Sequence, residues 1–123
     1  MALLKGNMKE CWRFFVLGDW GRRGSPEQLA VAKAMAARHK QGPADAVFTV
    51  GDNFYPDGLS APGDDHWQDS FHAVYAAALR ALPWYTALGN HDYRGNIHHQ
   101  FKPAAAPGWR SPGPYFALNF PTR

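Results

Sequence analysis

At three places in this 123-residue chain, an apolar run ends at a glycine, and the next residue has a side chain that can bind a metal ion. The three pairs are Gly18-Asp19, Gly51-Asp52 and Gly89-Asn90. Together they offer two carboxylates and one amide oxygen, and oxygen donors of this kind suit a hard, highly charged metal ion. Two carboxylates that face each other without a cation repel, so that one of them is pushed to protonate. The pattern therefore indicates a metal site, provided that the fold brings the three pairs together.

Short apolar runs alternate along the chain with segments whose apolar residues recur at helical spacing. These elements must bring the three pairs together. We expect strands at 12–17, 46–50, 84–88 and 115–120, each a short β-prone run. Strands that alternate with helices favour an α/β fold with a parallel sheet and right-handed crossovers. Ligands of such sheets bind at the carboxyl ends of the strands, and this is where Asp19, Asp52 and Asn90 would converge.

Two helices are expected between these strands. The first begins at Ser25 as N-cap, with Pro26 in the first turn and Gln28 closing a capping box, and it ends at Gly42. The second begins at Asp64 or Asp65 and ends at Pro83. Its apolar stripe contains Trp67, Phe71, Val74, Tyr75 and Ala78.

Composition excludes several classes of protein. Hydrophobic residues are 46% and aromatic residues 15%, which is typical of a folded globular protein. The formal net charge is only +3 with scattered basic residues, so no nucleic-acid partner is expected. Cys11 is the single cysteine, which excludes an intrachain disulfide and a cysteine-rich zinc site. No apolar run is long enough for a membrane span, and no export signal is seen, so the default location is the cytoplasm.

Three stretches carry a resemblance to a known family. Residues 18–21 read Gly-Asp-Trp-Gly, residues 51–55 read Gly-Asp-Asn-Phe-Tyr, and residues 89–92 read Gly-Asn-His-Asp. They resemble the first three of five signature motifs of the purple acid phosphatases, a branch of the calcineurin-like metallophosphoesterases. Many metallophosphoesterases have a histidine ligand in the first motif, whereas this chain has a tyrosine at Tyr55, as the purple branch does. The likeness runs from about Phe14 to Phe120 and is greatest to the small tartrate-resistant type.

The resemblance implies a role for each matching residue. Asp19 and Tyr55 would ligate iron(III), Asp52 would bridge two ions, and Asn90 would ligate a divalent second ion (Fe, Zn or Mn). His91 would contact the phosphate and help to protonate the leaving alcohol. The implied activity is hydrolysis of phosphate monoesters at a binuclear centre, where a metal-activated hydroxide attacks phosphorus.

The family pattern also implies that the domain is incomplete. Its last two motifs, Val-x-x-His and Gly-His-x-His, supply three further histidine ligands, and neither is in this chain. We therefore expect one partial domain over 1–123, with its motifs within about 12–120. It would be a truncated βαβαβ half of the metallophosphoesterase sandwich. Its sheet would expose an apolar face, through which the chain could self-associate.

Several alternatives remain open at this stage. The chain could be a non-catalytic remnant that binds a partner, or it could belong to a phosphodiesterase of the same superfamily. Arg22 and Arg23 could meet a phosphate or lie in a solvated loop. His98 and His99 are expected in a solvated loop and not as substitute ligands. Family members are often secreted or periplasmic, which leaves the location unknown.

Overall fold

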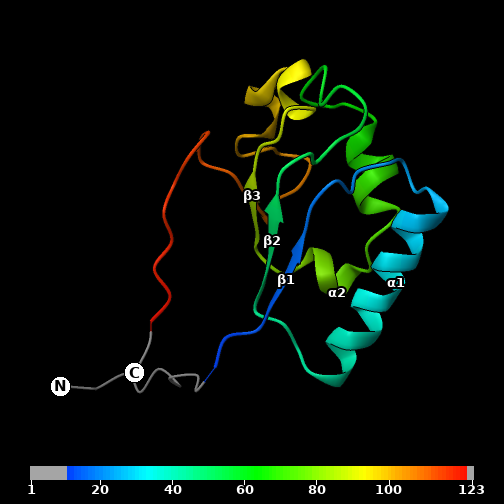
Figure 1. The fold of residues 1–123 in the computed structure, drawn as a ribbon, viewed down its shortest axis with the longest axis vertical. Coiled ribbons are helices and arrows are strands. Elements are labelled where there is room, and N and C mark those ends of the chain that lie inside the picture. The colour runs from blue at the N-terminus through cyan, green and yellow to red at the C-terminus, as the bar shows by residue number, and fades with distance from the viewer. Residues whose placement is uncertain (1–10, 122–123) are drawn as a thin grey trace.

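The computed structural model describes residues 11–121, which form one four-stranded sheet with helices on one side (Figure 1). All strand pairs are parallel, and the spatial order β1-β2-β3-β4 follows the chain. The strands are β1 (Phe14–Leu17), β2 (Ala46–Val50), β3 (Trp84–Ala87) and β4 (Trp109–Arg110). The register pairs Phe15 with Val47 and Val47 with Trp84, so the three longer strands end together at one edge. The predicted α/β class is confirmed.

Helix α1 (Pro26–Gln41) connects β1 to β2 and begins as expected. The Ser25 hydroxyl accepts a hydrogen bond from the Gln28 N–H at 3.3 Å, and the N–H of Gly42 closes the other end. The Gln28 side chain does not complete a capping box; its Oε1 accepts from the N–H groups of Arg22 and Gly24. Among the described residues, no helix is long and apolar enough to cross a membrane.

The expected second helix is wrong as one continuous element. The segment forms a π-helix, η1 (Trp67–His72), and a short α-helix, α2 (Ala77–Arg80), with an extended residue at Ala76 between them. Phe71 and Tyr75 both pack edge-on against Trp84, with ring centres 4.9 Å away in each case. The packing of these large rings overrides the helical spacing of the sequence. Two 3-10 turns follow β3, η2 (Asp92–Arg94) and η3 (Ile97–Gln100).

The predicted fourth strand at 115–120 is also wrong. The edge of β3 is occupied by β4, which lies outside the predicted strands. It pairs there because Trp109 is buried. The Trp109 indole N–H donates to the Gln100 carbonyl at 3.1 Å, which fixes the segment. Residues 115–121, here called the strap, pair with no strand; Figure 1 shows them on the side of the sheet away from α1 and α2.

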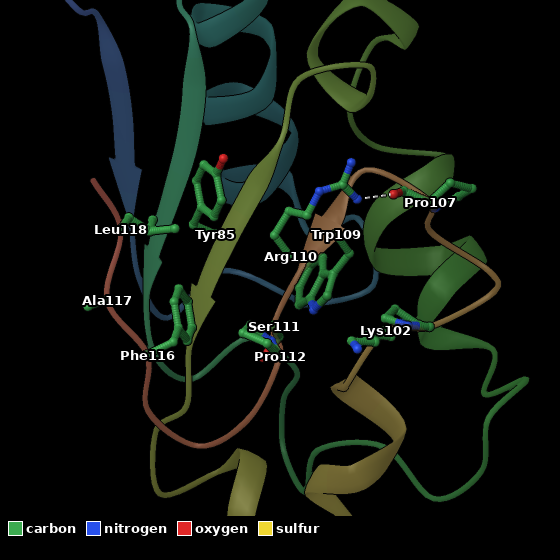
Figure 2. A pocket seen from close by; sticks show the side chains of 11 residues that line it. Tyr85, Lys102, Pro107, Trp109, Arg110, Ser111, Pro112, Phe116, Ala117 and Leu118 are labelled. Atoms are coloured by element: carbon green, nitrogen blue, oxygen red, sulfur yellow. Dashed lines mark hydrogen bonds between the residues drawn. The ribbon is translucent and has the colours of Figure 1, made fainter. Parts of the chain in front are cut away.

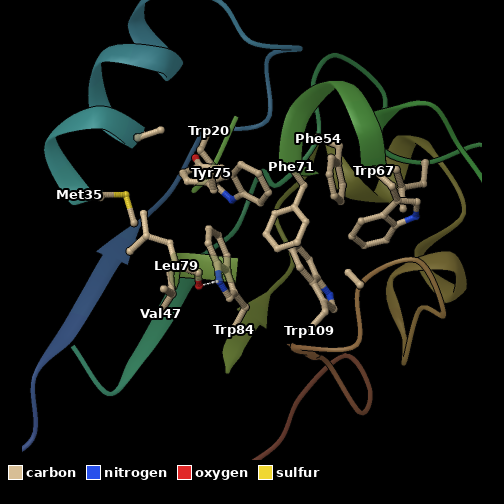
Figure 3. Packing of buried hydrophobic residues seen from close by; sticks show 13 residues of the cluster. Trp20, Met35, Val47, Phe54, Trp67, Phe71, Tyr75, Leu79, Trp84 and Trp109 are labelled. Atoms are coloured by element: carbon tan, nitrogen blue, oxygen red, sulfur yellow. Dashed lines mark hydrogen bonds between the residues drawn. The ribbon is translucent and has the colours of Figure 1, made fainter. Parts of the chain in front are cut away.

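The hydrophobic core lies between the sheet and the helices and consists mainly of aromatic rings (Figure 3). Trp84 is fully buried at its centre, stacked on Trp109 with ring centres 6.3 Å apart. Trp20 packs against both of these rings from the loop after β1. The first candidate motif is therefore anchored in the core by its own tryptophan.

The opposite face of the sheet is covered only in part, and we call it the open face. It carries Phe14, Val16, Phe48, Val50 and Tyr85. Val16 and Val50 are each 65% exposed. From the strap, Phe120 packs against Phe14 with ring centres 5.1 Å apart, but it leaves the two valines uncovered. The expectation of an exposed apolar face is confirmed, whereas self-association stays a prediction.

Candidate metal centre

The first two motifs form adjacent turns at the carboxyl edge of the sheet, here called the rim. Asp19 and Asp52 both adopt the left-handed backbone conformation, with φ of 56° and 52°. The Asp19 N–H donates to the Gly51 carbonyl at 3.1 Å and the Trp20 N–H to the Asp52 carbonyl at 3.2 Å. Left-handed backbone is strained for residues other than glycine, although aspartate tolerates it better than most. The two turns are thus held side by side, as the sequence predicts for strand ends of one parallel sheet.

The third motif reaches the same place because Gly89 has no side chain. A Cβ atom at Gly89 would lie 2.1 Å from the Asp52 Oδ1 atom. Since no Cβ atom tolerates such a distance, glycine is required for this loop to approach Asp52. The N–H of His91 donates to the same carboxylate oxygen at 3.0 Å.

Three oxygen atoms converge at the centre of the rim. The Tyr55 hydroxyl donates to Asp19 Oδ1 at 2.5 Å and lies 2.9 Å from Asp52 Oδ2. Asp19, Asp52 and Tyr55 were predicted as ligands from three separate positions in the sequence, and their side chains meet here. The phenol oxygen lies between two carboxylates, at a place to which a cation would be attracted.

Electrostatic shifts at these groups follow from the same contacts. Partial burial, followed by the hydrogen bonds to Asp19 and Asp52, raises the pKa of Tyr55 well above its ordinary value. Partial burial acts to raise the pKa of Asp52, but the N–H of His91 and the Tyr55 hydroxyl outweigh it and hold this pKa below its ordinary value. At neutral pH Asp52 is thus an anion beside a neutral phenol.

Asn90 and His91 follow Gly89 in the third loop. The Asn90 side chain is exposed, and within residues 11–121 it makes no side-chain hydrogen bond, so its predicted role as a ligand stays a prediction. The His91 Nδ1 atom lies 2.6 Å from the Pro56 carbonyl. A carbonyl only accepts, so Nδ1 must carry the proton and Nε2 is left as an acceptor. The His91 ring also packs on Tyr55, with centres 4.2 Å apart.

Beneath these loops lies a buried polar network that the sequence analysis did not assign. The Asp92 carboxylate is fully buried and accepts from the N–H groups of Asn53, Phe54 and Gly89 and from the Gln100 amide. It therefore ties the second motif loop to the third. Hydrogen bonds from three backbone groups and an amide provide the compensation that a buried carboxylate needs.

Asn53 extends this network to the first motif. Its Oδ1 accepts from the Trp20 indole N–H at 3.0 Å, and its Nδ2 donates to the Ala87 carbonyl and to Gln100 Oε1. The side chains of Trp20, Asn53, Asp92 and Gln100 are all buried, so none of them can touch a ligand directly. One sequence signal could have found them, because Asn53 and Asp92 directly follow Asp52 and His91 in the motifs themselves.

The two arginines after the first motif differ in their surroundings. Arg23 forms an ion pair with Asp69 at 2.9 Å, on a part of the surface formed by η1. The Arg22 guanidinium instead lies over the Tyr55 ring, with Cζ 3.8 Å from the ring centre, and its Nε donates to the Asp19 carbonyl at 3.1 Å. His98 and His99 lie on η3, and no contact joins either of them to the rim.

A sizeable cavity lies away from the rim. It has a volume of about 520 Å³ and lies between the sheet edge at Tyr85 and Arg110 and the strap at Phe116 and Leu118 (Figure 2). Its walls are mostly apolar, and no predicted ligand lines it. A smaller cleft of about 140 Å³ adjoins the rim and includes Asp19 and Arg22. Since the chemistry is at the rim, the size of the larger cavity does not identify it as the active site.

The donor set fits a metal ion in type but not in number. No group of three or more His, Cys, Asp or Glu side chains that could hold a metal is found in the described part of the chain. The rim offers two such side chains, Asp19 and Asp52, together with a phenol and an amide. Carboxylate, phenol and amide oxygens suit hard cations, so the chemistry of the set agrees with the implied metals.

Comparison with known proteins gives a match over nearly the whole described chain. The family profile named Metallophos, calcineurin-like phosphoesterase, matches residues 13–121. Purple acid phosphatase 3 of Arabidopsis thaliana is 48% identical over 90 residues, which is 73% of this chain and 25% of that protein. Purple acid phosphatase 7 of the same plant is 43% identical over 98 residues, 79% of this chain and 30% of the relative.

Animal and parasite proteins are also similar. Tartrate-resistant acid phosphatase type 5 of Mus musculus is 37% identical over 117 residues, covering 88% of this chain and 35% of that protein. The solved structure of GAP50, described as the anchor in the inner membrane complex of Plasmodium, superimposes with a TM-score of 0.73 at 28% identity. It covers 85% of this chain and 35% of that one. The chain thus spans a quarter to about a third of the length of these relatives.

Proposed function

Because the chain belongs to the calcineurin-like phosphoesterase family, we propose that it forms the N-terminal part of a metal-dependent acid phosphatase that hydrolyses phosphate monoesters. The similarity to proteins named acid phosphatases in plants and mammals supports this activity. The observation that carries the proposal is the meeting of Tyr55 with Asp19 and Asp52 at the rim. Tyr55, in place of a histidine in the first motif, is the feature by which the sequence resembles the purple branch.

In this proposal the residues of the rim hold a binuclear centre. Asp19 and Tyr55 would ligate iron(III), Asp52 would bridge the ions, and Asn90 would ligate the divalent ion. When bound, such a pair of ions would supply Lewis acidity to the phosphoryl group and lower the pKa of an attacking water. The Tyr55 phenol must lose its proton to act as a ligand, and its raised pKa means that the cation has to displace this proton.

His91 is proposed to act on the substrate without binding metal. Its Nδ1–H donates to the Pro56 carbonyl, which fixes the ring and leaves Nε2 available to other partners. In the imidazolium form of His91, Nε2–H would donate to a phosphate oxygen and then supply a proton to the leaving alcohol. The Asp92 network keeps the second and third loops at a fixed separation during this step.

The activity of the isolated chain is a separate question, because the three histidines of the last two motifs are not among its residues. We expect no appreciable hydrolysis of an aryl phosphate by residues 1–123 at acidic pH with iron and zinc. A chimera that joins this chain to the remaining length of Arabidopsis purple acid phosphatase 3 should be active. Metal-dependent turnover by the chain alone would contradict the incomplete-centre part of the proposal. An inactive, folded chimera would contradict the proposed activity.

The similarity to an anchor protein supports a second candidate, a non-catalytic binding module. The open face, with two valines at 65% exposure, is a surface on which a protein partner could dock. A chimera that folds and takes up no iron would favour this candidate. Strong iron uptake with the colour of a tyrosine–iron(III) complex would favour the phosphatase.

A further inference from the structure

Two neighbouring arginines follow the first motif, and only one of them has its charge neutralised. Arg23 is paired with Asp69 at 2.9 Å. Among residues 11–121, Arg22 has no carboxylate partner, although it is exposed to solvent and lies beside the rim. The two residues have the same chemistry and adjacent positions, so their different surroundings come from the fold.

Arg22 is held in place by contacts that leave its main donors free. Its Nε donates to the Asp19 carbonyl at 3.1 Å, and its Cζ lies 3.8 Å from the centre of the Tyr55 ring. Among residues 11–121, neither Nη1 nor Nη2 makes a hydrogen bond. These N–H groups form a planar fork that matches two oxygens of a phosphate.

The position of Arg22 complements that of His91. Both groups pack on the Tyr55 ring, the guanidinium at 3.8 Å and the imidazole at 4.2 Å from its centre. An anion bound beside the exposed edge of Tyr55 would therefore meet a fixed positive charge from one loop and an imidazole from another. Asp19 and Asp52 repel an anion unless cations neutralise them, so this contact depends on a loaded metal centre.

We infer that Arg22 is a substrate-binding residue, whose guanidinium donates to the phosphate group of the monoester at the rim. The inference rests on the proposed function, because it needs the metal centre that the proposal assigns. It adds to that proposal a fixed, non-metal phosphate contact from the first motif loop. The competing role for Arg22 is structural, namely to hold the Tyr55 ring in place.

The test uses the metal-loaded chimera described above and inorganic phosphate as the probe. Three variants are compared with the parent: Arg22→Gln, Arg22→Lys and, as matched control, Arg23→Gln. The visible absorption of the tyrosine–iron(III) pair reports whether Tyr55 still binds iron. Phosphate titration followed by this absorption and by inhibition of aryl phosphate hydrolysis reports the affinity for the anion.

We expect Arg22→Gln to keep the iron absorption and to weaken phosphate binding about tenfold or more, as the loss of a charge-assisted hydrogen bond does. Arg22→Lys should fall between the parent and Arg22→Gln, because a lysine keeps the charge and loses the planar fork. Arg23→Gln should match the parent. The KM for an aryl phosphate should rise in Arg22→Gln more than kcat falls.

Two results would overturn this inference and leave the proposed function standing. Parent-like phosphate affinity in Arg22→Gln would show that the guanidinium does not touch the anion. Loss of the iron absorption together with phosphate binding would assign Arg22 the structural role instead. If the parent itself takes up no iron, the proposed function fails and the inference fails with it.

Discussion

At the rim of the sheet, the buried Asp92 carboxylate accepts hydrogen bonds from three backbone N–H groups and a side-chain amide. On the open face, 65% of the Val16 and Val50 side chains remains exposed, and the strap that crosses the face makes no strand pairing. The rim is thus held together by groups within this chain. The open face lacks such partners, and apolar surface of this kind is usually covered by another element. The order of the candidate site therefore does not depend on whatever covers the open face.

The largest effect should come from removing the buried carboxylate of the rim. Asp92→Ala leaves four donors without an acceptor, three of them buried and one partly buried, and we expect it to lower the free energy of unfolding by at least about 3 kcal/mol. Urea unfolding measures this change. Asp57→Ala is the matched control, since this carboxylate is 69% exposed and lies 3.8 Å from Arg94, and it should cost no more than about 0.5 kcal/mol. Equal losses in the two variants would mean that the rim is not held by Asp92.

Next in size is the effect of the bridging carboxylate on metal binding. Asp52→Ala in the chimera should weaken metal binding by more than about 100-fold, because the loss of a direct ligand exceeds the 10–100-fold typical of supporting contacts. It should also reduce hydrolysis more than His91→Ala does, since both ions depend on Asp52. Metal content after dialysis and turnover of an aryl phosphate are the measurements. A milder effect than that of His91→Ala would contradict the bridging role.

A smaller effect is expected on the open face, on association rather than on stability. If the exposed valines drive self-association, the double change Val16→Thr and Val50→Thr should weaken it about tenfold in sedimentation velocity. The free energy of unfolding should change little, because both side chains are largely exposed already. Val31→Thr, on α1 and 50% exposed, is the control and should leave association unchanged. A parent chain that is monomeric at all concentrations would contradict self-association through the open face.

The last effect concerns alkaline pH and involves one tyrosine of the core and one of the rim. Burial raises the pKa of Tyr75 to about 12, and burial with two carboxylates raises that of Tyr55. Both therefore keep their protons in the folded chain at pH values where the unfolded chain, with an ordinary pKa of 10.0, has lost them. Stability should be complete below pH 10 and fall as pH rises further, by up to about 1.4 kcal/mol per unit from Tyr75. Tyrosinate absorbance should show fewer ionised groups in the folded chain, and Tyr55→Phe should remove one protected group.

The sequence predicted the meeting of Asp19 with Asp52 and the exposed apolar face, but it missed the buried network below the rim and the strand that pairs with β3. Strand ends of a parallel sheet meet at one edge, so the convergence of Asp19 and Asp52 follows from topology alone. Asn53 and Asp92 could have been found from their places in the motifs, but the share of Gln100 in their network could not, because it joins from a 3-10 turn with no signal of its own. The strand expected at 115–120 failed because burial of Trp109 decided which segment pairs with β3. Periodicity carries no information on that competition.

The hydrogen bond between the Trp12 indole and the Pro121 carbonyl, across 109 positions of the chain, has a consequence for engineering. Trp12 and Phe120 also contact each other through their rings, at 5.2 Å. Both ends of the described chain therefore leave the molecule at one place, and Figure 1 shows it at the base of the strands, opposite the rim. A circular permutant that joins these ends with a short linker would keep every strand contact. New termini could open in the exposed loop at 61–63, away from the buried pairing of β2 with β3.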